Sequence, residues 1–400
     1  MAKQRVLALD EMDRDLIKQI EPDWHKMMTC IQCGSCSASC PAGHLMDHGP
    51  RELWRLMRLG MRDELTSTRT FWLCTQCYAC TVRCPRGIIT SETMLNLRRW
   101  AIAEGLEVPA TLPQLKESVE TTHNILHEDN ETRLIWSENL EPVPQQLRAP
   151  RRQADVLLFA GCVGAMYPMT YSIPQSFVQI LEQAGVTYAS LAADEWCCGY
   201  PLYGAGLEAE VAELAQHNIE RVQGVNPKYL VATCPSCYHT WNHIYPQYSS
   251  DEFGFDVLHA SQLLARLIGE RRIKLNELDW IVTYHDPCDL GRKSGVYDEP
   301  RLIINSVPGI TFKEMRNHRE NALCCGGGGD VAMWEADVTE DIAKRRMEQA
   351  IATGATAIIS ACQQCKRTLL QAARKTKTRI RVLDVAELVW QAMEKGEVIG

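Results

Sequence analysis

Short runs rich in apolar and β-branched residues alternate with amphipathic segments from Asp155 to the end of the chain. Such runs predict buried strands, and apolar positions at helical spacing predict the helices between them. In the first half of this region, strands are expected over 155–159, 187–189 and 229–233, and helices over 176–185 and 208–223. Because buried strands that alternate with helices are typical of parallel sheets, the region is predicted to be α/β.

The same order of elements returns in the second half of this region. Strands are expected over 280–285 and 356–360, helices near 299–306 and over 338–354, and a final capped helix over 384–395. Equivalent cysteines of the two halves lie 126 to 128 residues apart. A nearly constant offset over so long a stretch indicates a duplicated unit.

The N-terminal part follows a different, mainly helical pattern. Residues 1–29 are expected to form an amphipathic helical lead-in, and helices are expected over 51–61 and 91–103, the second with Ser91 as its N-cap. From 104 to 150 the periodicity weakens to one helix and a proline-bearing stretch, which predicts a linker.

The predicted fold class is therefore α/β with an α-helical N-terminal domain, followed by two pseudo-repeated parallel α/β domains. The predicted boundaries are 1–105 for the helical domain, 106–153 for the linker, 154–275 for the first α/β domain and 276–400 for the second.

All 18 cysteines fall into four ordered sets. The first two sets are CxxCxxCxxxCP runs, at Cys30, Cys33, Cys36, Cys40 and at Cys74, Cys77, Cys80, Cys84. The other two sets are the first quintet and the second quintet: Cys162, Cys197, Cys198, Cys234, Cys237; and Cys288, Cys324, Cys325, Cys362, Cys365.

The N-terminal runs have the spacing of bacterial two-cluster ferredoxins. Three cysteines at two-residue intervals can bind one face of an iron–sulfur cube, and the fourth usually ligates the other cluster. The predicted ligand sets are therefore crossed: Cys30, Cys33, Cys36 and Cys84 for one [4Fe–4S] cluster, and Cys74, Cys77, Cys80 and Cys40 for the other. Structural zinc sites also use CxxC pairs, but eight cysteines in two such runs exceed what tetrahedral zinc needs.

The quintets cannot be local loops, because 34 to 36 residues separate their parts. Each quintet is expected to be assembled from three strand ends, at the carboxyl edge where α/β folds place their sites. Adjacent cysteines point apart in a regular strand, so both can serve one centre only on a turn, which the following Gly199 and Gly326 permit. Five thiolates exceed the four of a cubane cluster or a zinc site; the alternative is one bystander thiol in each quintet.

The composition is that of an ordinary globular protein, with 46% hydrophobic and 23% charged residues. A net charge of −8 argues against a nucleic-acid-binding surface. The N-terminus has no apolar stretch of signal-peptide length, and the longest apolar run, 156–167, is shorter than the roughly 20 residues of a membrane-spanning helix. We expect a cytoplasmic location, with any membrane association made through a partner subunit, and thiols that serve as ligands instead of disulfides.

The cysteine pattern from about residue 25 onward resembles heterodisulfide reductase. The quintets look like the paired CCG domains of its B-type subunit, and the N-terminal runs look like its C-type ferredoxin module; their fusion is the arrangement of the D-type subunit. The resemblance implies a noncubane [4Fe–4S] cluster in each quintet and a disulfide that is split between the two clusters. The ten quintet cysteines are then the implied catalytic residues. Both quintets are complete, whereas degenerate sets are frequent in the iron–sulfur subunits of glycolate, lactate and glycerol-3-phosphate dehydrogenases.

The expected function is that of the catalytic subunit of a heterodisulfide-reductase-like complex, which reduces or in reverse forms a thiol disulfide. A non-catalytic electron-transfer subunit of a flavoprotein dehydrogenase, passing electrons toward quinone, is the second hypothesis; a zinc-stabilised scaffold is the third. No GxGxxG fingerprint follows a strand, so a flavoprotein or a membrane cytochrome b is expected as the electron partner. The sequence does not identify the disulfide, and both small thiols and sulfur-carrier proteins are candidate sources of it. The direction of electron flow is also open.

Some residues near the quintets support weaker hypotheses. His239, His285 and His318 lie within six positions of quintet cysteines, and an imidazole could donate a proton to a leaving thiolate; a structural role is the favoured alternative. The glycine run 326–329 has no following Lys-Ser/Thr and is no Walker loop, so it is expected to pack closely around a cluster.

Overall fold

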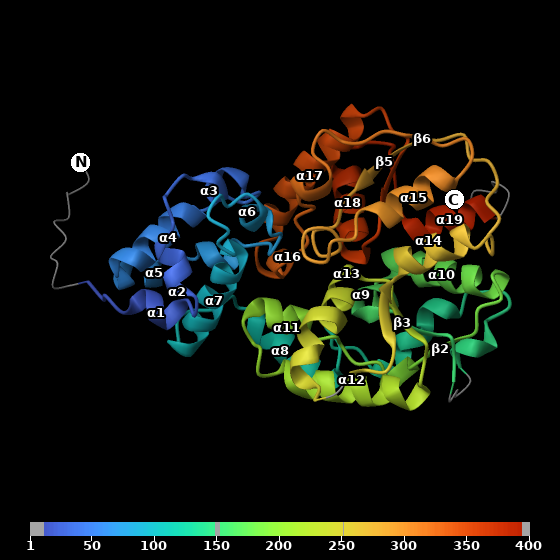
Figure 1. Ribbon diagram of the computed structural model, residues 1–400, viewed down its shortest axis with the longest axis horizontal. Helices are drawn as coiled ribbons and strands as arrows, with labels where there is room; N and C mark the ends of the chain where they lie inside the picture. The colour runs from blue at the N-terminus through green and yellow to red at the C-terminus, as the bar shows by residue number, and fades with distance from the viewer. Residues whose placement is uncertain (1–11, 149–152, 251, 394–400) are drawn as a thin grey trace.

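The computed structural model describes residues 12–148, 153–250 and 252–393. Figure 1 shows a helical N-terminal part at one end of the molecule and two α/β units that lie side by side at the other end. Each α/β unit is built on a four-stranded sheet in which every strand pair is parallel. The predicted fold class is confirmed.

Short helices joined by cysteine-bearing loops make up the N-terminal part. The helices of this part and of the connection after it are α1 (Leu16–Ile20), α2 (Trp24–Met28), α3 (Ser35–Ser39), α4 (Pro50–Leu59), α5 (Arg62–Ser67), α6 (Ala79–Val82), α7 (Thr90–Ala103) and α8 (Leu112–Thr122). The helices expected over 51–61 and 91–103 are α4 and α7. The expected lead-in consists of α1 and α2 over its described part; residues 1–11 lie outside the described residues.

Helix α7 begins at Thr90, so the prediction that Ser91 caps it is wrong. Ser91 lies in the first turn, where its backbone N–H donates to Thr81 Oγ1 at 3.0 Å and its hydroxyl lies 2.7 Å from the same atom. Thr81 belongs to α6, which also carries Cys80. The first-turn N–H that a cap would satisfy is therefore bound by the neighbouring helix, and this bond fixes α7 against the cysteine loop.

The first α/β unit has the strand order β2-β1-β3-β4. Its strands and helices are β1 (Val156–Phe159), α9 (Gly161–Met166), α10 (Ser172–Gln183), β2 (Tyr188–Ser190), α11 (Tyr200–Ala205), α12 (Val211–Val225), β3 (Tyr229–Ala232), α13 (Pro235–His239), β4 (Asp256–His259) and α14 (Ala260–Gly269). β1 is wholly buried and paired on both sides, with Val156 opposite Tyr188 and Tyr229. All strands and long helices expected in this half are present, and β4 with α14 was not predicted.

The second α/β unit repeats this topology with the order β6-β5-β7-β8. Its strands and helices are β5 (Ile281–His285), α15 (Asp298–Ser306), β6 (Thr311–Phe312), α16 (Val331–Trp334), α17 (Ala336–Ala352), β7 (Ala357–Ser360), α18 (Gln363–Lys375), β8 (Arg381–Asp384) and α19 (Val385–Met393). The expected C-terminal helix is α19, and it is capped: Ala386 N–H donates to Asp384 Oδ1 at 3.0 Å and Asp384 N–H to Glu387 Oε2 at 2.7 Å. Positions 394 and 395 of that expectation lie outside the described residues.

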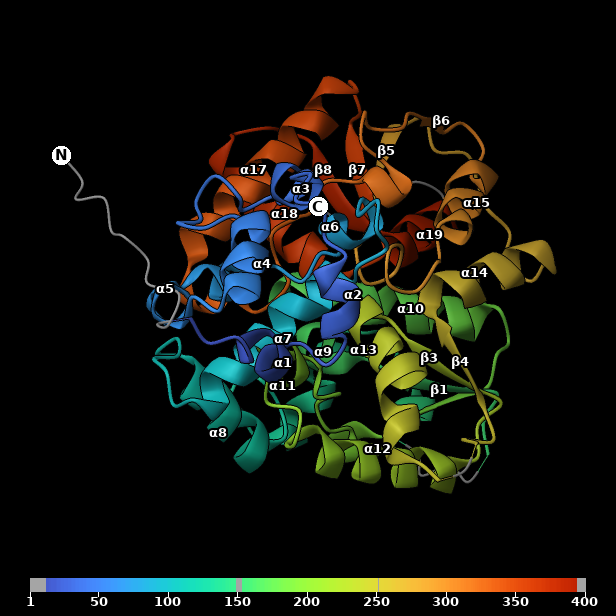
Figure 2. The same cartoon turned by 60° about the vertical axis from the view of Figure 1, so that its left-hand side comes forward.

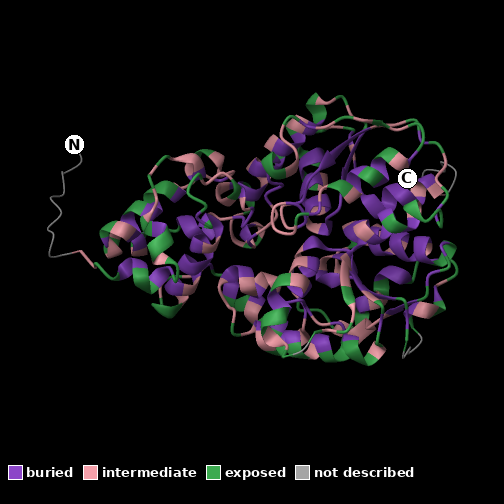
Figure 3. Ribbon diagram, in the orientation of Figure 1, coloured by how far each residue is buried: buried purple, intermediate pink, exposed green. Residues whose placement is uncertain are grey.

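The two α/β units pack through equivalent helices. α10 packs against α19, and α14 packs against α15. Because α10 corresponds to α15 and α14 to α19, an approximate two-fold axis relates the two contacts. Lys366 in α18 adds a polar link, with Nζ 2.8 Å from Ser172 Oγ in the first unit and 2.8 Å from the Glu387 carboxylate in the second. Figure 3 shows that the inner strands β1, β3, β5 and β7 are largely buried.

Among the helices that the structure describes, none combines the length and the apolarity needed to cross a lipid bilayer.

Candidate functional site

The first quintet is assembled at the carboxyl edge of the first sheet. Cys162 lies in the first turn of α9, just after β1, while Cys234 is the N-cap of α13, just after β3, and Cys237 lies within that helix. Cys197 and Cys198 lie in the loop that leads from β2 to α11. All five thiols are buried and free. Because β1, β2 and β3 are parallel neighbours, their carboxyl ends bring these distant segments to one edge.

The second quintet occupies the equivalent edge of the second sheet. Cys288 follows β5, Cys362 is the N-cap of α18 after β7, and Cys365 lies in that helix. Cys324 and Cys325 precede α16, at the end of the long loop that leaves β6. The Sγ atoms of Cys325 and Cys365 are 3.2 Å apart.

Each pair of adjacent cysteines lies on a turn that ends in a left-handed glycine. The backbone φ is +79° at Gly199 and +85° at Gly326. The Gly199 N–H donates to Cys197 Sγ at 3.4 Å, and the Gly326 N–H donates to Cys324 Sγ at 3.2 Å. The expected turn and its need for glycine are confirmed.

Replacing Gly326 by alanine is expected to lower the free energy of unfolding by about 2 kcal/mol, because the left-handed φ is strained for alanine and the new Cβ would lie 2.6 Å from the Thr339 carbonyl oxygen. We also expect loss of iron from the second quintet. Gly224→Ala, in α12 with nothing near its Cβ position, is the control and should be neutral or stabilising. Thermal unfolding and iron content measure both variants; equal values for the two would contradict the prediction.

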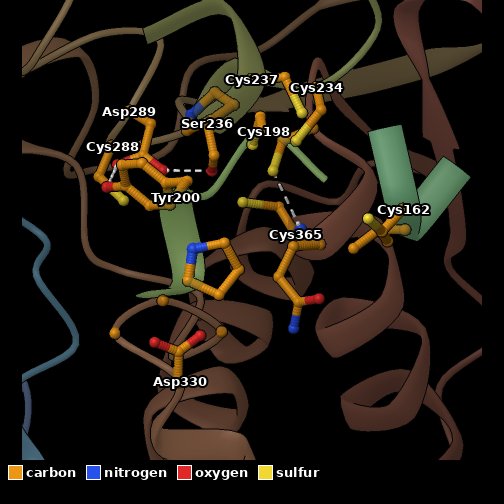
Figure 4. A pocket seen from close by; sticks show the side chains of 18 of the residues that line it. Cys162, Cys198, Tyr200, Cys234, Ser236, Cys237, Cys288, Asp289, Asp330 and Cys365 are labelled. Atoms are coloured by element: carbon orange, nitrogen blue, oxygen red, sulfur yellow. Dashed lines mark hydrogen bonds between the residues drawn. The ribbon is translucent and has the colours of Figure 1, made fainter. Parts of the chain in front are cut away.

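Both quintets line one cavity of about 120 Å³ (Figure 4). Nine of the ten quintet cysteines line it: Cys162, Cys197, Cys198, Cys234, Cys237, Cys288, Cys325, Cys362 and Cys365. The tenth, Cys324, lines a different cavity together with Cys40 and Cys77 of the N-terminal part. The quintets therefore face each other across one space, and the second quintet also faces the N-terminal cysteines.

A buried polar group that the sequence did not reveal borders the shared cavity. Asp289 accepts hydrogen bonds from Ser236 Oγ at 2.6 Å and from the Tyr200 hydroxyl at 3.1 Å, and pairs with Lys293 Nζ at 2.9 Å. Burial disfavours the charged form of Lys293, but Asp289 together with the nearby Cys288 and Glu92 outweighs this and raises the pKa of Lys293. The ion pair thus stays charged at neutral pH, and it joins side chains from both α/β units.

A second buried ion pair lies beside the first quintet. Arg133 Nη2 lies 3.5 Å from Cys162 Sγ and 3.2 Å from Glu195 Oε1. Glu195 also accepts two backbone N–H groups just after β1, at 3.0 and 2.8 Å. The hydrogen bond from Cys197 and the charge of Arg133 lower the pKa of Cys162 to about 7 in spite of its burial. Neither Arg133 nor Glu195 was predicted as a site residue. Arg133 lies in the expected linker, where the sequence indicated no site.

Of the three histidines considered, His285 lies at the second quintet. Its Nδ1 accepts from Arg346 Nε at 2.9 Å, so the neutral ring carries its proton on Nε2. Burial lowers the pKa of His285, which keeps the ring neutral. A ring nitrogen of His285 and the thiols of Cys325 and Cys365 lie within 4.8 Å of one another. None of the three histidines is among the described residues that line the shared cavity.

The N-terminal cysteines come together in the crossed arrangement. One small cavity is lined by the first N-terminal set, namely Cys30, Cys33, Cys36 and Cys84. Cys40 lies beside the three cysteines with which it forms the second N-terminal set: Cys74, Cys77 and Cys80. Burial and these neighbouring thiolates raise the pKa of Cys40.

The four cysteine sets follow one another in space. Cys36 of the first N-terminal set lies close enough to Cys80 of the second for their charges to interact. The hydrogen bond from Cys324 lowers the pKa of Cys77 to about 5, which puts the second N-terminal set in contact with the second quintet. The two quintets interact across the shared cavity. The order is therefore first N-terminal set, second N-terminal set, second quintet, first quintet.

Arg98 in α7 holds the three parts of the molecule together. Its guanidinium is fully buried and donates at 2.7 to 3.3 Å to five backbone carbonyl oxygens, those of Phe71, Trp72, Cys74, Gly204 and Gly329. A side chain on Gly329 would clash with the Cys74 carbonyl, so the glycine run packs tightly against the loop of the second N-terminal set. Neither contact was visible in the sequence.

The donor sets fit iron–sulfur clusters. Thiolates are the ligands that these clusters use, and all 18 cysteines are free in the structure. At the first quintet the backbone leaves room for the thiols, since a Cβ on Gly161 would lie 2.8 Å from Cys237 Sγ. Five thiols around each quintet edge exceed the four that zinc binds.

Two domain families match the chain in the order of its parts. The 4Fe-4S dicluster domain matches residues 26–88, and the cysteine-rich domain matches residues 156–242 and 282–370. The D-type subunit of the dihydromethanophenazine:CoB–CoM heterodisulfide reductase of Methanosarcina mazei is 32% identical over 311 residues, which cover 77% of this chain and 74% of that protein. The EtfAB:quinone oxidoreductase of Syntrophomonas wolfei is 30% identical over 254 residues, covering 61% of this chain and 35% of that protein.

Among solved structures, a hypothetical protein from Helicobacter pylori is similar in fold alone, with a TM-score of 0.53 and 10% identity over 96% of this chain and 77% of that one.

The domain matches and the relatives make the chain an iron–sulfur oxidoreductase subunit that works within a complex. By its identity to the Methanosarcina mazei relative and by the order of its domains, the chain belongs to the family of D-type heterodisulfide reductase subunits.

Proposed function

We propose that this chain is the catalytic subunit of a heterodisulfide-reductase-like complex, which cleaves or in reverse forms the S–S bond of a thiol-derived disulfide. The observation that carries this proposal is the shared cavity, which nine of the ten quintet cysteines line from two sides. A molecule held there contacts both centres at once. The Methanosarcina mazei relative belongs to a CoB–CoM heterodisulfide reductase, which supports the same reaction class.

The proposed cofactors are a cubane [4Fe–4S] cluster in each N-terminal set and a noncubane [4Fe–4S] cluster in each quintet, with all 18 cysteines as ligands and about sixteen irons in total. When bound, the clusters supply electrons one at a time. The net reaction adds two electrons and two protons to the disulfide, breaks one S–S bond and yields two thiols. The spatial order of the four sets gives these electrons a continuous route from the N-terminal part to the cavity.

The side chains around the cavity orient the substrate and tune the thiolates. The hydroxyls of Ser236 and Tyr200, held by Asp289, give one wall a fixed polar surface that can position a polar part of the substrate. At the second quintet, a ring nitrogen of His285 lies within 4.8 Å of the thiols of Cys325 and Cys365, where a polar group can stabilise a thiolate. Arg133 supplies the matching positive charge at Cys162.

A flavoprotein or a membrane cytochrome b is the proposed electron partner, and association with a membrane would be made through that partner in a cytoplasmic complex. The substrate is the disulfide of a small thiol or of a sulfur-carrier protein.

Turnover by the loaded full-length chain tests the proposal. With reduced methyl viologen as the donor, the anaerobically purified protein is expected to oxidise two dye molecules for each disulfide, because each dye supplies one electron. The CoB–CoM heterodisulfide, glutathione disulfide and coenzyme A disulfide are the probes. A protein that holds about sixteen irons but consumes none of these probes would contradict the proposal.

The second candidate function is an electron relay toward quinone, and the similarity to the EtfAB:quinone oxidoreductase of Syntrophomonas wolfei favours it. In that case the loaded protein should pass electrons to a soluble quinone analogue and leave every disulfide intact.

A further inference from the structure

The first N-terminal set lies beneath a surface that the proposed reaction does not use. Cys33 is exposed, whereas Cys77 of the second N-terminal set is buried. Ile31 and Ile89 are 62% and 54% exposed, the two highest values among the exposed large hydrophobic side chains of the described residues. Figure 1 shows this helical part at one end of the molecule, and Figure 2 turns that end toward the viewer.

Basic side chains surround these apolar residues. Arg51 and Arg86 line the small cavity of the first N-terminal set together with Ile31 and Cys33. Lys26 reaches the same loop, with Nζ 3.8 Å from the position of a Cβ on Gly87. We call this region the Cys33 surface; it consists of Lys26, Ile31, Cys33, Arg51 and Arg86, and Ile89 follows Gly87 by two positions.

The basic side chains of the Cys33 surface are not held in salt bridges within the described chain. Lys26, Arg51 and Arg86 are exposed, and the salt bridges of the described residues include none of them. The nearby carboxylates of Asp23 and Glu52 accept backbone N–H groups at the starts of α2 and α4, at 3.3 and 3.0 Å. Three basic side chains without a salt bridge therefore lie close together on a chain whose net charge is −8.

We propose that the Cys33 surface is the docking site for an acidic, soluble electron-carrier protein. Such a carrier is repelled by the chain as a whole and attracted to this one surface, so its encounters are steered to the exposed edge of the first N-terminal set. The small apolar centre around Cys33 suits the brief, small interfaces of electron-transfer partners. In each encounter the carrier loses one electron and the cluster of the first N-terminal set gains it; no bond changes.

A protein carrier fits this surface better than an anionic membrane does. The exposed Cys33 must come close to another redox centre, and lipid headgroups hold none. The inference rests on the proposed cluster at the first N-terminal set and is independent of disulfide cleavage, because its test follows the arrival of electrons and the binding of the carrier.

The test uses flavodoxin hydroquinone as the acidic carrier and the loaded full-length protein. Bleaching of the iron–sulfur absorbance in a stopped-flow instrument gives the second-order rate constant, and titration calorimetry with oxidised flavodoxin gives the affinity. The double substitution Arg51→Glu/Arg86→Glu should lower the rate constant at least tenfold at low salt, and high salt should abolish the difference. Iron content and bleaching by dithionite, measured on each variant, separate loss of the cluster from loss of docking.

A matched charge reversal supplies the control. Lys274→Glu/Lys313→Glu makes the same change in net charge after α14 and after β6, at the opposite end of the molecule (Figure 1), and should lower the rate constant less than twofold. Arg51→Gln/Arg86→Gln should give an intermediate loss, which guards against misfolding of the double glutamate variant. Equal losses in both charge reversals would overturn the proposal. It would also be overturned if the Arg51/Arg86 variants lost binding to phosphatidylglycerol vesicles and kept full reactivity with flavodoxin.

Discussion

Replacing Cys325 by alanine is expected to lower disulfide turnover at least a hundredfold, which corresponds to about 2.7 kcal/mol in activation free energy. Cys325 lines the shared cavity, and electrons reach that cavity through the second quintet. Iron quantitation should show a loss of about one quarter, because only one of four proposed centres is damaged. The methyl viologen assay and iron content measured on the same sample check both parts.

The equivalent change in the first quintet, Cys198→Ala, separates a shared reaction from a simple chain of carriers. It should abolish disulfide turnover to the same extent, although the second quintet still receives electrons. Val163→Ala is the control, since Val163 lines the same cavity without a thiol and should keep all iron and most activity. Substantial disulfide turnover by Cys198→Ala would show that one quintet is sufficient.

Replacing Arg98 by alanine is expected to lower the free energy of unfolding by at least about 3 kcal/mol, because each buried acceptor that loses its donor costs about 1 to 3 kcal/mol. Five backbone carbonyl oxygens from three parts of the molecule would lose their donor. Arg98→Lys should not restore stability, because an ammonium has three donors and cannot reproduce the planar fork of a guanidinium. Anaerobic thermal and guanidinium unfolding measure these changes.

The neighbouring Arg99 provides the control for Arg98. Arg99 pairs with Glu208 at 2.7 Å, and both side chains are partly exposed. Such an ion pair contributes at most about 1 kcal/mol, so Arg99→Ala should have a small effect. Losses of equal size in Arg98→Ala and Arg99→Ala would contradict the role assigned to Arg98.

The parts of the fold that were predictable are those with a strong local pattern. β1 and β7 are short, wholly buried apolar runs, and their hydrophobic pattern alone identifies them. β4 and β8 were missed because they are edge strands, in which partly exposed residues interrupt the apolar pattern over only four positions. The start of α7 was misjudged for a different reason, since its first-turn N–H bonds to a threonine on another helix.

The candidate site likewise has a part that the sequence predicted and a part that it did not. The cysteine spacing predicted which thiols lie together, including the exchange of Cys40 and Cys84 between the N-terminal sets. The charged residues beside them have no such spacing. Arg133 reaches Glu195 and Cys162 from a segment that reads as a linker, and Arg98 acts through backbone carbonyls that carry no sequence signal. Contacts of this kind depend on how the domains pack and are visible only in three dimensions.

The most direct test of the shared site is an anaerobic crystal structure of the fully loaded protein with a bound disulfide that it turns over. We expect the two sulfur atoms of the substrate to lie in the cavity between Cys198 and Cys325, in reach of both quintets. A disulfide bound outside that cavity, or in contact with one quintet alone, would contradict this expectation.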